Sequence, residues 1–333
     1  MLLDPSQARA VFLYALEQRF ALLAVNADSP AAVTDVLEAA KSEQAPVMIE
    51  ASLWQLTGQS FGAGDPALGL ARYLVQIALL ANAERFRDVP VLFHTDHIKG
   101  PVTLPLLRSA IRGLPTGVES TVVSPSTISL DSSGMNEADN IAALCDLGET
   151  ARACGRLVTL EMEAGVDDGI TPLDVTERLL GAVESRIPGQ LALWAPGVGT
   201  QHGLGEQTAF SAQAVERHQK RASEVAGRPL GIALHGSSGL SEAGLHDAVR
   251  AGVVKVNWSS ESLLLRSQSA QEFYSTRAAA LQKGHPDWKA TAMDHGVQSF
   301  VSQRYLPRVR ERIRLLGGSD RAPGCLAQLR HLA

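Results

Sequence analysis

The sequence predicts a (β/α)₈ barrel, and two observations lead to this fold class. Eight short apolar runs alternate with amphipathic helical stretches along the chain, which is the pattern of βα units around a parallel sheet. Three histidines stand where such a run passes into a polar, glycine-rich loop. A parallel barrel brings the carboxyl ends of all its strands to one mouth, so residues far apart in the sequence can converge there.

The eight expected strands follow one another at regular intervals. They lie at 21–26, 46–50, 89–94, 117–123, 157–163, 191–195, 230–235 and 252–257. Helical patterns fill the intervals, for example 31–43, which follows a Ser29-Pro30 start, and 139–154. A doubly wound open sheet is the alternative, but no G-x-G-x-x-G motif follows the first strand to support a dinucleotide site.

No linker, repeat or low-complexity stretch divides the 333 residues. We therefore expect residues 1–333 to form a single barrel domain, with 265–333 adding helices after the eighth strand.

Composition excludes several kinds of partner. The net charge is −5 and there is no block of Lys and Arg, which argues against a nucleic-acid surface. The start of the chain lacks the features of a signal peptide, and no apolar run reaches the roughly 18 residues that span a membrane. The three cysteines form no C-x-x-C pair, so reduced thiols are expected. These features predict a cytoplasmic protein without a membrane partner.

The three histidine segments are VLFHTDH (91–97), VGTQHGLG (198–205) and GIALHGSSG (231–239). Three neutral imidazoles with an open fourth position are what a catalytic Zn²⁺ requires. One such segment alone would be read equally well as a buried histidine that caps a loop, with its aspartate as a helix cap. Three of them at equivalent strand ends favour a metal site. The remaining histidines outside these segments, at 218, 246, 285, 295 and 331, are expected to face solvent.

Two glutamates end the fifth strand. Glu161 and Glu163 are two residues apart, so their side chains point to the same side of the strand. A strand buried on both faces is usually almost entirely apolar, and buried carboxylates are costly unless they are paired. Two interpretations stay open: salt-bridged acids inside the barrel, or a metal or substrate role.

Loops after the last three strands offer small residues and backbone N–H groups. They contain Gly203, the run Gly236-Ser237-Ser238-Gly239, and Ser259-Ser260. Phosphate sites in barrels favour the loops after the seventh and eighth strands and a helix N-terminus there. Because Arg and Lys are nearly absent from these loops, backbone dipoles would contribute much of the binding.

Taken together, these segments resemble the class II, metal-dependent fructose-bisphosphate aldolases and their tagatose-bisphosphate relatives. The resemblance covers most of the chain. It rests on ALLAVNADSPAAVTDVLEAAKSEQAPVMIEAS at the start, followed by HTDH, LDSSGMNEADNI, GTQHG, LHGSSG and GVVKVNWSSE in the family's order.

The resemblance implies a role for each matching residue. His97, His202 and His235 would hold the Zn²⁺, and Asp96 would be the acid–base group. Asn257 would hold the enediolate, and Asn26 and Ser52 would lie near the substrate. The phosphate would be received by Gly203, Gly236, Ser238, Ser259 and Ser260, with a monovalent cation beside it. Asp131 and Glu163 match positions that take a second or displaced metal.

The resemblance implies reversible retro-aldol cleavage of a phosphorylated ketose to a dihydroxyacetone phosphate-like fragment and an aldehyde, by a homodimer or homotetramer. Two alternatives are a metal-dependent sugar-phosphate isomerase or epimerase, and a non-catalytic relative that binds metal and sugar phosphate.

Three departures from the family pattern affect the expected substrate. The loop after the fifth strand is shortened to 165–169, where Asp167 or Asp168 would replace the family's proton-shuttling Glu. The pair after Asn257 is Ser259-Ser260, nearer to the tagatose-type pattern. The family's C-terminal arginine, which in some members binds the far phosphate from a neighbouring subunit, has no clear counterpart, and Arg304, Arg308 and Arg310 match it only loosely.

Overall fold

The computed structural model describes residues 1–115, 122–132, 134–165, 167 and 169–330. Eight parallel strands close into a barrel in the order β1-β10-β9-β8-β7-β6-β3-β2, which confirms the predicted fold class. The barrel strands are β1 (Leu22–Asn26), β2 (Val47–Ala51), β3 (Val91–Thr95), β6 (Thr127–Ile128), β7 (Leu160–Ala164), β8 (Leu191–Pro196), β9 (Gly231–Leu234) and β10 (Val253–Trp258).

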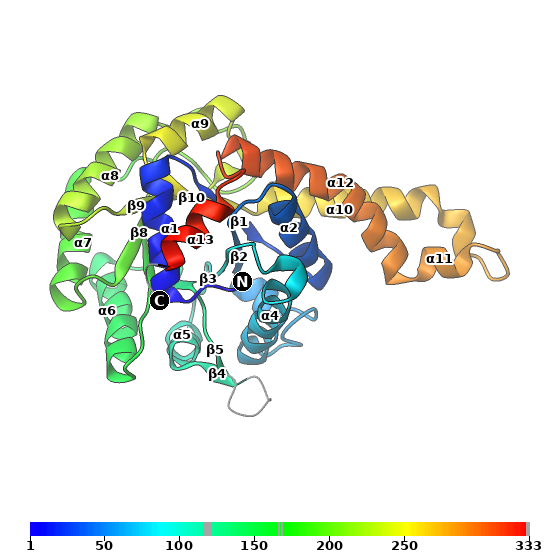
Figure 1. The fold of residues 1–333 in the computed structure, drawn as a ribbon, viewed down its shortest axis with the longest axis horizontal. Helices are drawn as coiled ribbons and strands as arrows, with labels where there is room; N and C mark the ends of the chain where they lie inside the picture. The colour runs from blue at the N-terminus through cyan, green and yellow to red at the C-terminus, as the bar shows by residue number, and fades with distance from the viewer. Residues whose placement is uncertain (116–121, 133, 166, 168, 331–333) are drawn as a thin grey trace.

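Helices surround the barrel (Figure 1). Those up to the eighth barrel strand are α1 (Pro5–Gln18), α2 (Pro30–Ser42), α3 (Leu53–Thr57), α4 (Pro66–Ala81), α5 (Thr103–Arg112), α6 (Glu137–Ala153), α7 (Leu173–Arg186), α8 (Ala212–Ala226) and α9 (Glu242–Ala251), with the 3₁₀ turns η1 (Glu84–Phe86) and η2 (Ser237–Gly239). The expected Ser29-Pro30 start is present: Ser29 Oγ accepts a hydrogen bond from the Ala32 N–H, and Pro30 occupies the first turn.

The fourth barrel strand is not where the sequence analysis placed it. Within the described part of 117–123, Val122–Val123 forms β5, which pairs antiparallel with β4 (Leu114–Pro115) outside the barrel. The barrel instead uses β6, whose neighbourhood is polar. Ser126 Oγ donates to the Leu3 carbonyl at 2.6 Å, and Thr127 Oγ1 lies 2.7 Å from His94 Nδ1. Polar side chains that form hydrogen bonds occupy the positions around this strand. The apolar run by which the other strands were predicted is therefore absent here.

The far end of the barrel from the mouth is closed by α1 together with residues near the C-terminus. Phe12, Phe20 and Leu22 belong to a buried cluster there, beside Cys325 of α13 (Ala322–Arg330). Figure 1 shows α1 and α13 crossing the barrel together.

After β10 the chain forms α10 (Ser260–Thr276), η3 (Ala278–Leu281), α11 (Trp288–Ala292) and α12 (Asp294–Leu315). Figure 1 shows this segment projecting as an arm from the barrel. Glu43 ties the near end of α12 to the barrel, because its carboxylate accepts from Arg310 Nε at 2.7 Å and Arg314 Nη2 at 2.6 Å. In the part of the chain that the structure describes, no helix is both long and apolar enough to span a membrane.

Candidate active site

The carboxyl ends of the strands surround a cavity of about 740 Å³. Most residues singled out in the sequence line it, although they come from loops spread over the whole chain. The lining includes Asn26, Ser52, Asp96, His97, Asp131, Glu163, Asp167, His202, Gly203, Gly236, Ser238, Asn257, Ser259 and Ser260. His235 lies directly against this set, and Asp168 lies outside the described residues.

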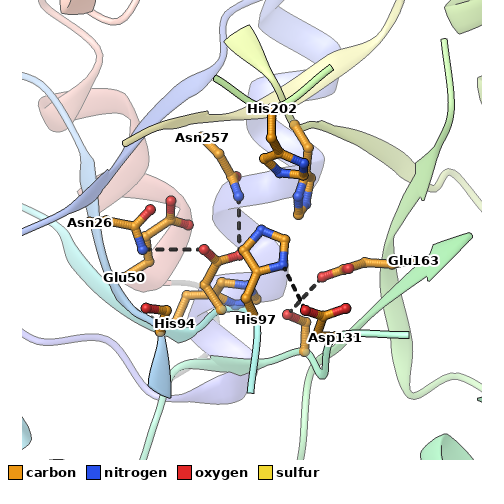
Figure 2. Close-up of polar contacts among 12 residues, drawn as sticks. Asn26, Glu50, His94, His97, Asp131, Glu163, His202 and Asn257 are labelled. Carbon is orange, nitrogen blue, oxygen red and sulfur yellow. Dashed lines mark hydrogen bonds and ion pairs between the residues drawn. The ribbon is translucent and has the colours of Figure 1, made fainter. Parts of the chain in front are cut away.

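Three imidazoles converge at the mouth (Figure 2). The ring centroids of His97 and His202 are 4.9 Å apart, those of His97 and His235 5.3 Å, and those of His202 and His235 5.8 Å. One nitrogen from each ring lies within 4.8 Å of the others. His97 adopts a left-handed backbone conformation with φ of 48°, an uncommon geometry for a residue other than glycine that recurs at functional sites.

Two of the imidazoles are oriented by carboxylates through one ring nitrogen. His202 Nδ1 lies 2.9 Å from Asp167 Oδ2, and His235 Nε2 lies 2.9 Å from Glu161 Oε1. His235 Nδ1 is buried and has no hydrogen-bond partner in the structure. A buried ring nitrogen without a partner is unfavourable unless a ligand completes it, and a carboxylate on the other nitrogen is the usual arrangement of metal-binding histidines. The donor set therefore fits a divalent metal such as Zn²⁺.

Asp96 lies beside the imidazoles and is almost completely buried. Its Oδ1 accepts from Asn257 Nδ2 and its Oδ2 from Asn26 Nδ2, both at 3.2 Å (Figure 2). Burial alone would raise its pKa, but the positive charges of His97, Lys255 and a second histidine outweigh burial and lower it. The two amides fix the carboxylate in place at the floor of the cavity.

The two glutamates of β7 have different surroundings. Glu161 lies inside the barrel, 2.9 Å from Lys255 Nζ, so it is a salt-bridged interior acid. Glu163 lines the cavity and accepts from Ser129 Oγ at 3.2 Å. Burial raises the pKa of Glu163 to about 8, against the opposing effect of His97. Glu161 thus fits the interpretation as a salt-bridged acid inside the barrel, and Glu163 fits the interpretation as a metal or substrate residue.

Two buried charged groups beneath the cavity, Lys255 and Glu50, were not predicted from the sequence. Lys255 is fully buried between Glu161 and Glu50, whose Oε2 lies 3.4 Å from Nζ. Burial lowers the pKa of Lys255, but the neighbouring carboxylates outweigh this and raise it above its ordinary value. The signal was present in VVKVN (253–257), where a lysine interrupts an apolar strand and shares a face with Asn257.

His218 corrects another expectation, since it is buried rather than solvent-facing. Only 1% of the residue is exposed, and its Nδ1 lies 2.9 Å from Thr176 Oγ1 between α7 and α8. Its amphipathic helix places it on the packed face, away from the cavity.

The small-residue loops present backbone to the cavity, as an anion site requires. Gly236 has φ of 66°, and a Cβ there would lie 2.6 Å from the Gln201 carbonyl oxygen, so only glycine fits. Ser260 begins α10, whose N-terminal N–H groups provide a partial positive charge next to the cavity.

Comparisons with known proteins agree with this geometry. The chain is 29% identical over 247 residues to a fructose-bisphosphate aldolase of Streptococcus pyogenes serotype M3, covering 72% of this chain and 73% of the relative. It is 28% identical over 323 residues to a fructose-bisphosphate aldolase of Haemophilus influenzae, covering 83% of each.

The fold is shared with two solved structures. One is a fructose-bisphosphate aldolase of Campylobacter jejuni, with a TM-score of 0.80, 22% identity and coverage of 96% of this chain and 95% of that one. The other is the YdjI aldolase of Escherichia coli K12, with a TM-score of 0.69, 18% identity and coverage of 97% and 100%. Residues 6–321 match the family described as fructose-bisphosphate aldolase class-II. The chain therefore belongs to the class-II fructose-bisphosphate aldolase family.

Proposed function

We propose that this protein is a Zn²⁺-dependent aldolase that reversibly cleaves a phosphorylated ketose to a dihydroxyacetone phosphate-like fragment and an aldehyde. The observation that carries the proposal is the convergence of His97, His202 and His235 beside the buried carboxylate of Asp96. We further propose, from family likeness, that the whole chain acts as one catalytic domain within a homodimer or homotetramer.

The three imidazoles would hold the metal. When bound, a divalent metal acts as a Lewis acid that polarises the ketose carbonyl and stabilises the enediolate left by carbon–carbon cleavage. Asp131 and Glu163 border the same space and would serve a second or displaced metal position. This donor set needs no lysine in the cavity to form a Schiff base.

Asp96 would transfer the proton at the aldehyde oxygen. In the cleavage direction its carboxylate accepts the proton of the hydroxyl that becomes the aldehyde, and in the condensation direction it returns that proton. Asn257 holds Asp96 through Nδ2, while its buried Oδ1 has no hydrogen-bond partner. That oxygen can accept a hydrogen bond from a hydroxyl of the enediolate fragment, and Asn26 and Ser52 border the same space.

The phosphate would lie against the loops after β8, β9 and β10, where a monovalent cation would supply charge that the side chains lack. The residues that would receive it are Gly203, Gly236, Ser238, Ser259 and Ser260. Proton transfer at the enediolate carbon is assigned, as a prediction, to Asp167 or Asp168 in the loop after β7.

The short loop 165–169 favours a second candidate, a metal-dependent isomerase or epimerase that stops at the enediolate. Product analysis separates the two. Incubation of the zinc-loaded protein with ketose phosphates should release a triose phosphate and an aldehyde in equal amounts. Conversion to another sugar phosphate of the same carbon number would support the second candidate. Binding without conversion of any ketose phosphate would leave only the non-catalytic alternative.

A further inference from the structure

We propose that the ketose substrate carries a single phosphate, on the fragment that becomes dihydroxyacetone phosphate, and that its aldehyde end is a neutral hydroxylated chain. This inference rests on the proposed aldolase function and on the phosphate position described above. It concerns the wall of the cavity opposite the phosphate loops.

The order of the strands in the barrel shows which wall of the cavity lies opposite the phosphate loops. In the closed ring, β10 and β6 are four strands apart, as are β9 and β3. The loops after β6 and β3 therefore face the phosphate loops across the mouth. These loops and the first turn of α6 contribute the residues that we call the opposite wall: Lys99, Asp131, Ser132, Met135, Glu137 and Asn140. A ketose whose phosphate lies at β9 and β10 would extend its other end toward this wall.

The charge of the cavity does not suit a second phosphate. Among the described residues that line the cavity, Lys99 is the only lysine or arginine. Its Nζ lies 3.3 Å from Asp131 Oδ2, and its side chain is 59% exposed. On the opposite wall two carboxylates, those of Asp131 and Glu137, outnumber it. A phosphate monoester brings about 1.5 to 2 further negative charges at neutral pH, so it would meet repulsion there.

An arginine that contacts the lining of the cavity is already paired with two carboxylates. Arg178 of α7 lies outside the described lining, with Nη2 2.8 Å from Glu137 Oε1. Its Nη1 pairs with Asp174 on the same helix. Two carboxylates thus share this guanidinium, which leaves it poorly placed to take a third anion.

Asn140 gives the opposite wall a specific preference for hydroxyl groups. The residue is 4% exposed, and its Nδ2 donates to the Glu163 carbonyl oxygen at 2.9 Å. That bond fixes the orientation of the amide, because the reverse orientation would set two acceptors against each other. Its Oδ1 is buried and has no hydrogen-bond partner. A hydroxyl can donate to this oxygen, whereas a phosphate dianion has no proton to donate.

The test compares matched substrates on the zinc-loaded full chain. Fructose and tagatose 1-phosphates are measured beside the corresponding 1,6-bisphosphates, with release of dihydroxyacetone phosphate, which each substrate yields once per cleavage, as the readout. We expect kcat/KM to favour the monophosphates by about 100-fold, from the unfavourable contact of like charges. Equal or better cleavage of the bisphosphates overturns this inference while the aldolase function stands. Absence of cleavage for all four overturns the aldolase function itself, and this inference with it.

Two variants test the opposite wall directly. Glu137→Gln removes one carboxylate and should raise the ratio of kcat/KM for a bisphosphate to kcat/KM for the monophosphate about tenfold. The matched control is Asp174→Asn, which removes the other carboxylate on Arg178 but lies outside the described lining. A rise of the same size in the control would show that a released Arg178, rather than the wall, sets the selectivity. Lys99→Met should change kcat/KM for the monophosphate and for the bisphosphate by the same factor. A selective loss of bisphosphate cleavage would contradict the proposal.

Discussion

Asp167 is the residue whose role the structure tests most sharply. The resemblance to the aldolase family assigns it, or Asp168, to proton transfer, yet its carboxylate is in contact with a predicted metal ligand. Asp167 Oδ1 accepts from the His202 backbone N–H at 2.8 Å, and Oδ2 lies 2.9 Å from Nδ1 of the same residue. These contacts would orient His202 so that its other ring nitrogen faces the two remaining imidazoles.

The substitution Asp167→Asn separates the two roles. Loss of a carboxylate that orients a metal-binding histidine weakens metal affinity by about 10- to 100-fold. The side chains of Asp167 and His202 are 56% and 39% exposed, so solvent screens their interaction. We therefore expect the lower end of that range, about tenfold, which corresponds to about 1.4 kcal/mol.

The assay is titration of the metal-free variant with Zn²⁺, followed by kcat at saturating zinc. An orienting role predicts that zinc affinity falls about tenfold and that kcat recovers when zinc saturates the site. Unchanged zinc affinity with a kcat lower by about 100-fold or more would refute this reasoning and assign Asp167 to proton transfer.

Three further predictions concern other residues. Asp96→Asn should keep bound zinc and lower kcat by about 10² to 10⁴. The control Asp28→Asn, at the same end of the barrel, should keep both the bound zinc and the kcat of the parent. A fully active Asp96→Asn variant would remove this residue from the mechanism. Lys255→Met should lower the free energy of unfolding in urea by about 3 to 5 kcal/mol, because it removes the buried cation between the carboxylates of Glu50 and Glu161, and a loss below about 1 kcal/mol would contradict this. Burial acts to raise the pKa of Glu43, but arginines of α12 outweigh it and lower the pKa to about 2, so its stabilisation is present above pH 4.5 and is lost as the pH falls toward 2. Glu43→Gln should therefore lower the free energy of unfolding by about 1 to 2 kcal/mol at pH 7, and this difference from the parent should disappear toward pH 2. The control Glu84→Gln, in an exposed ion pair, should lower it by under about 0.5 kcal/mol.

The strands that the sequence predicted well are those with a continuous apolar run. β1 begins one residue after the predicted start at 21, and β8 begins at the predicted Leu191. β6 failed because it is two residues long and polar, with its backbone position fixed by bonds such as that from Ser126 Oγ to the Leu3 carbonyl. Contacts of that kind join distant parts of the chain, and a local pattern does not contain them.

The same distinction applies to the cavity. His97, His202 and His235 were found because each follows an apolar strand, and strand ends meet at the mouth of a parallel barrel. Lys99 and Asn140 were missed because they lie in a loop and in a helix, where no periodicity marks a side chain that lines a cavity.

Glu161 and Glu163 show the limit of local pattern most clearly. They share a strand and a face, yet one pairs with a buried lysine and the other borders the cavity. Their depth along the barrel decides the difference, and depth depends on the register of β7 against its neighbours. The sequence could establish that both point to the same side of the strand, but only the assembled barrel separates their environments.

The central claim is that three imidazoles hold a catalytic metal, and the most direct test is zinc titration of the metal-free protein during cleavage of a ketose phosphate. We expect about one zinc bound per chain, release of triose phosphate that rises in proportion to bound zinc, and complete loss of cleavage when a chelator removes the metal. Substitution of His202 by alanine should weaken zinc binding and cleavage together. Cleavage that continues at full rate in the metal-free protein would contradict the account.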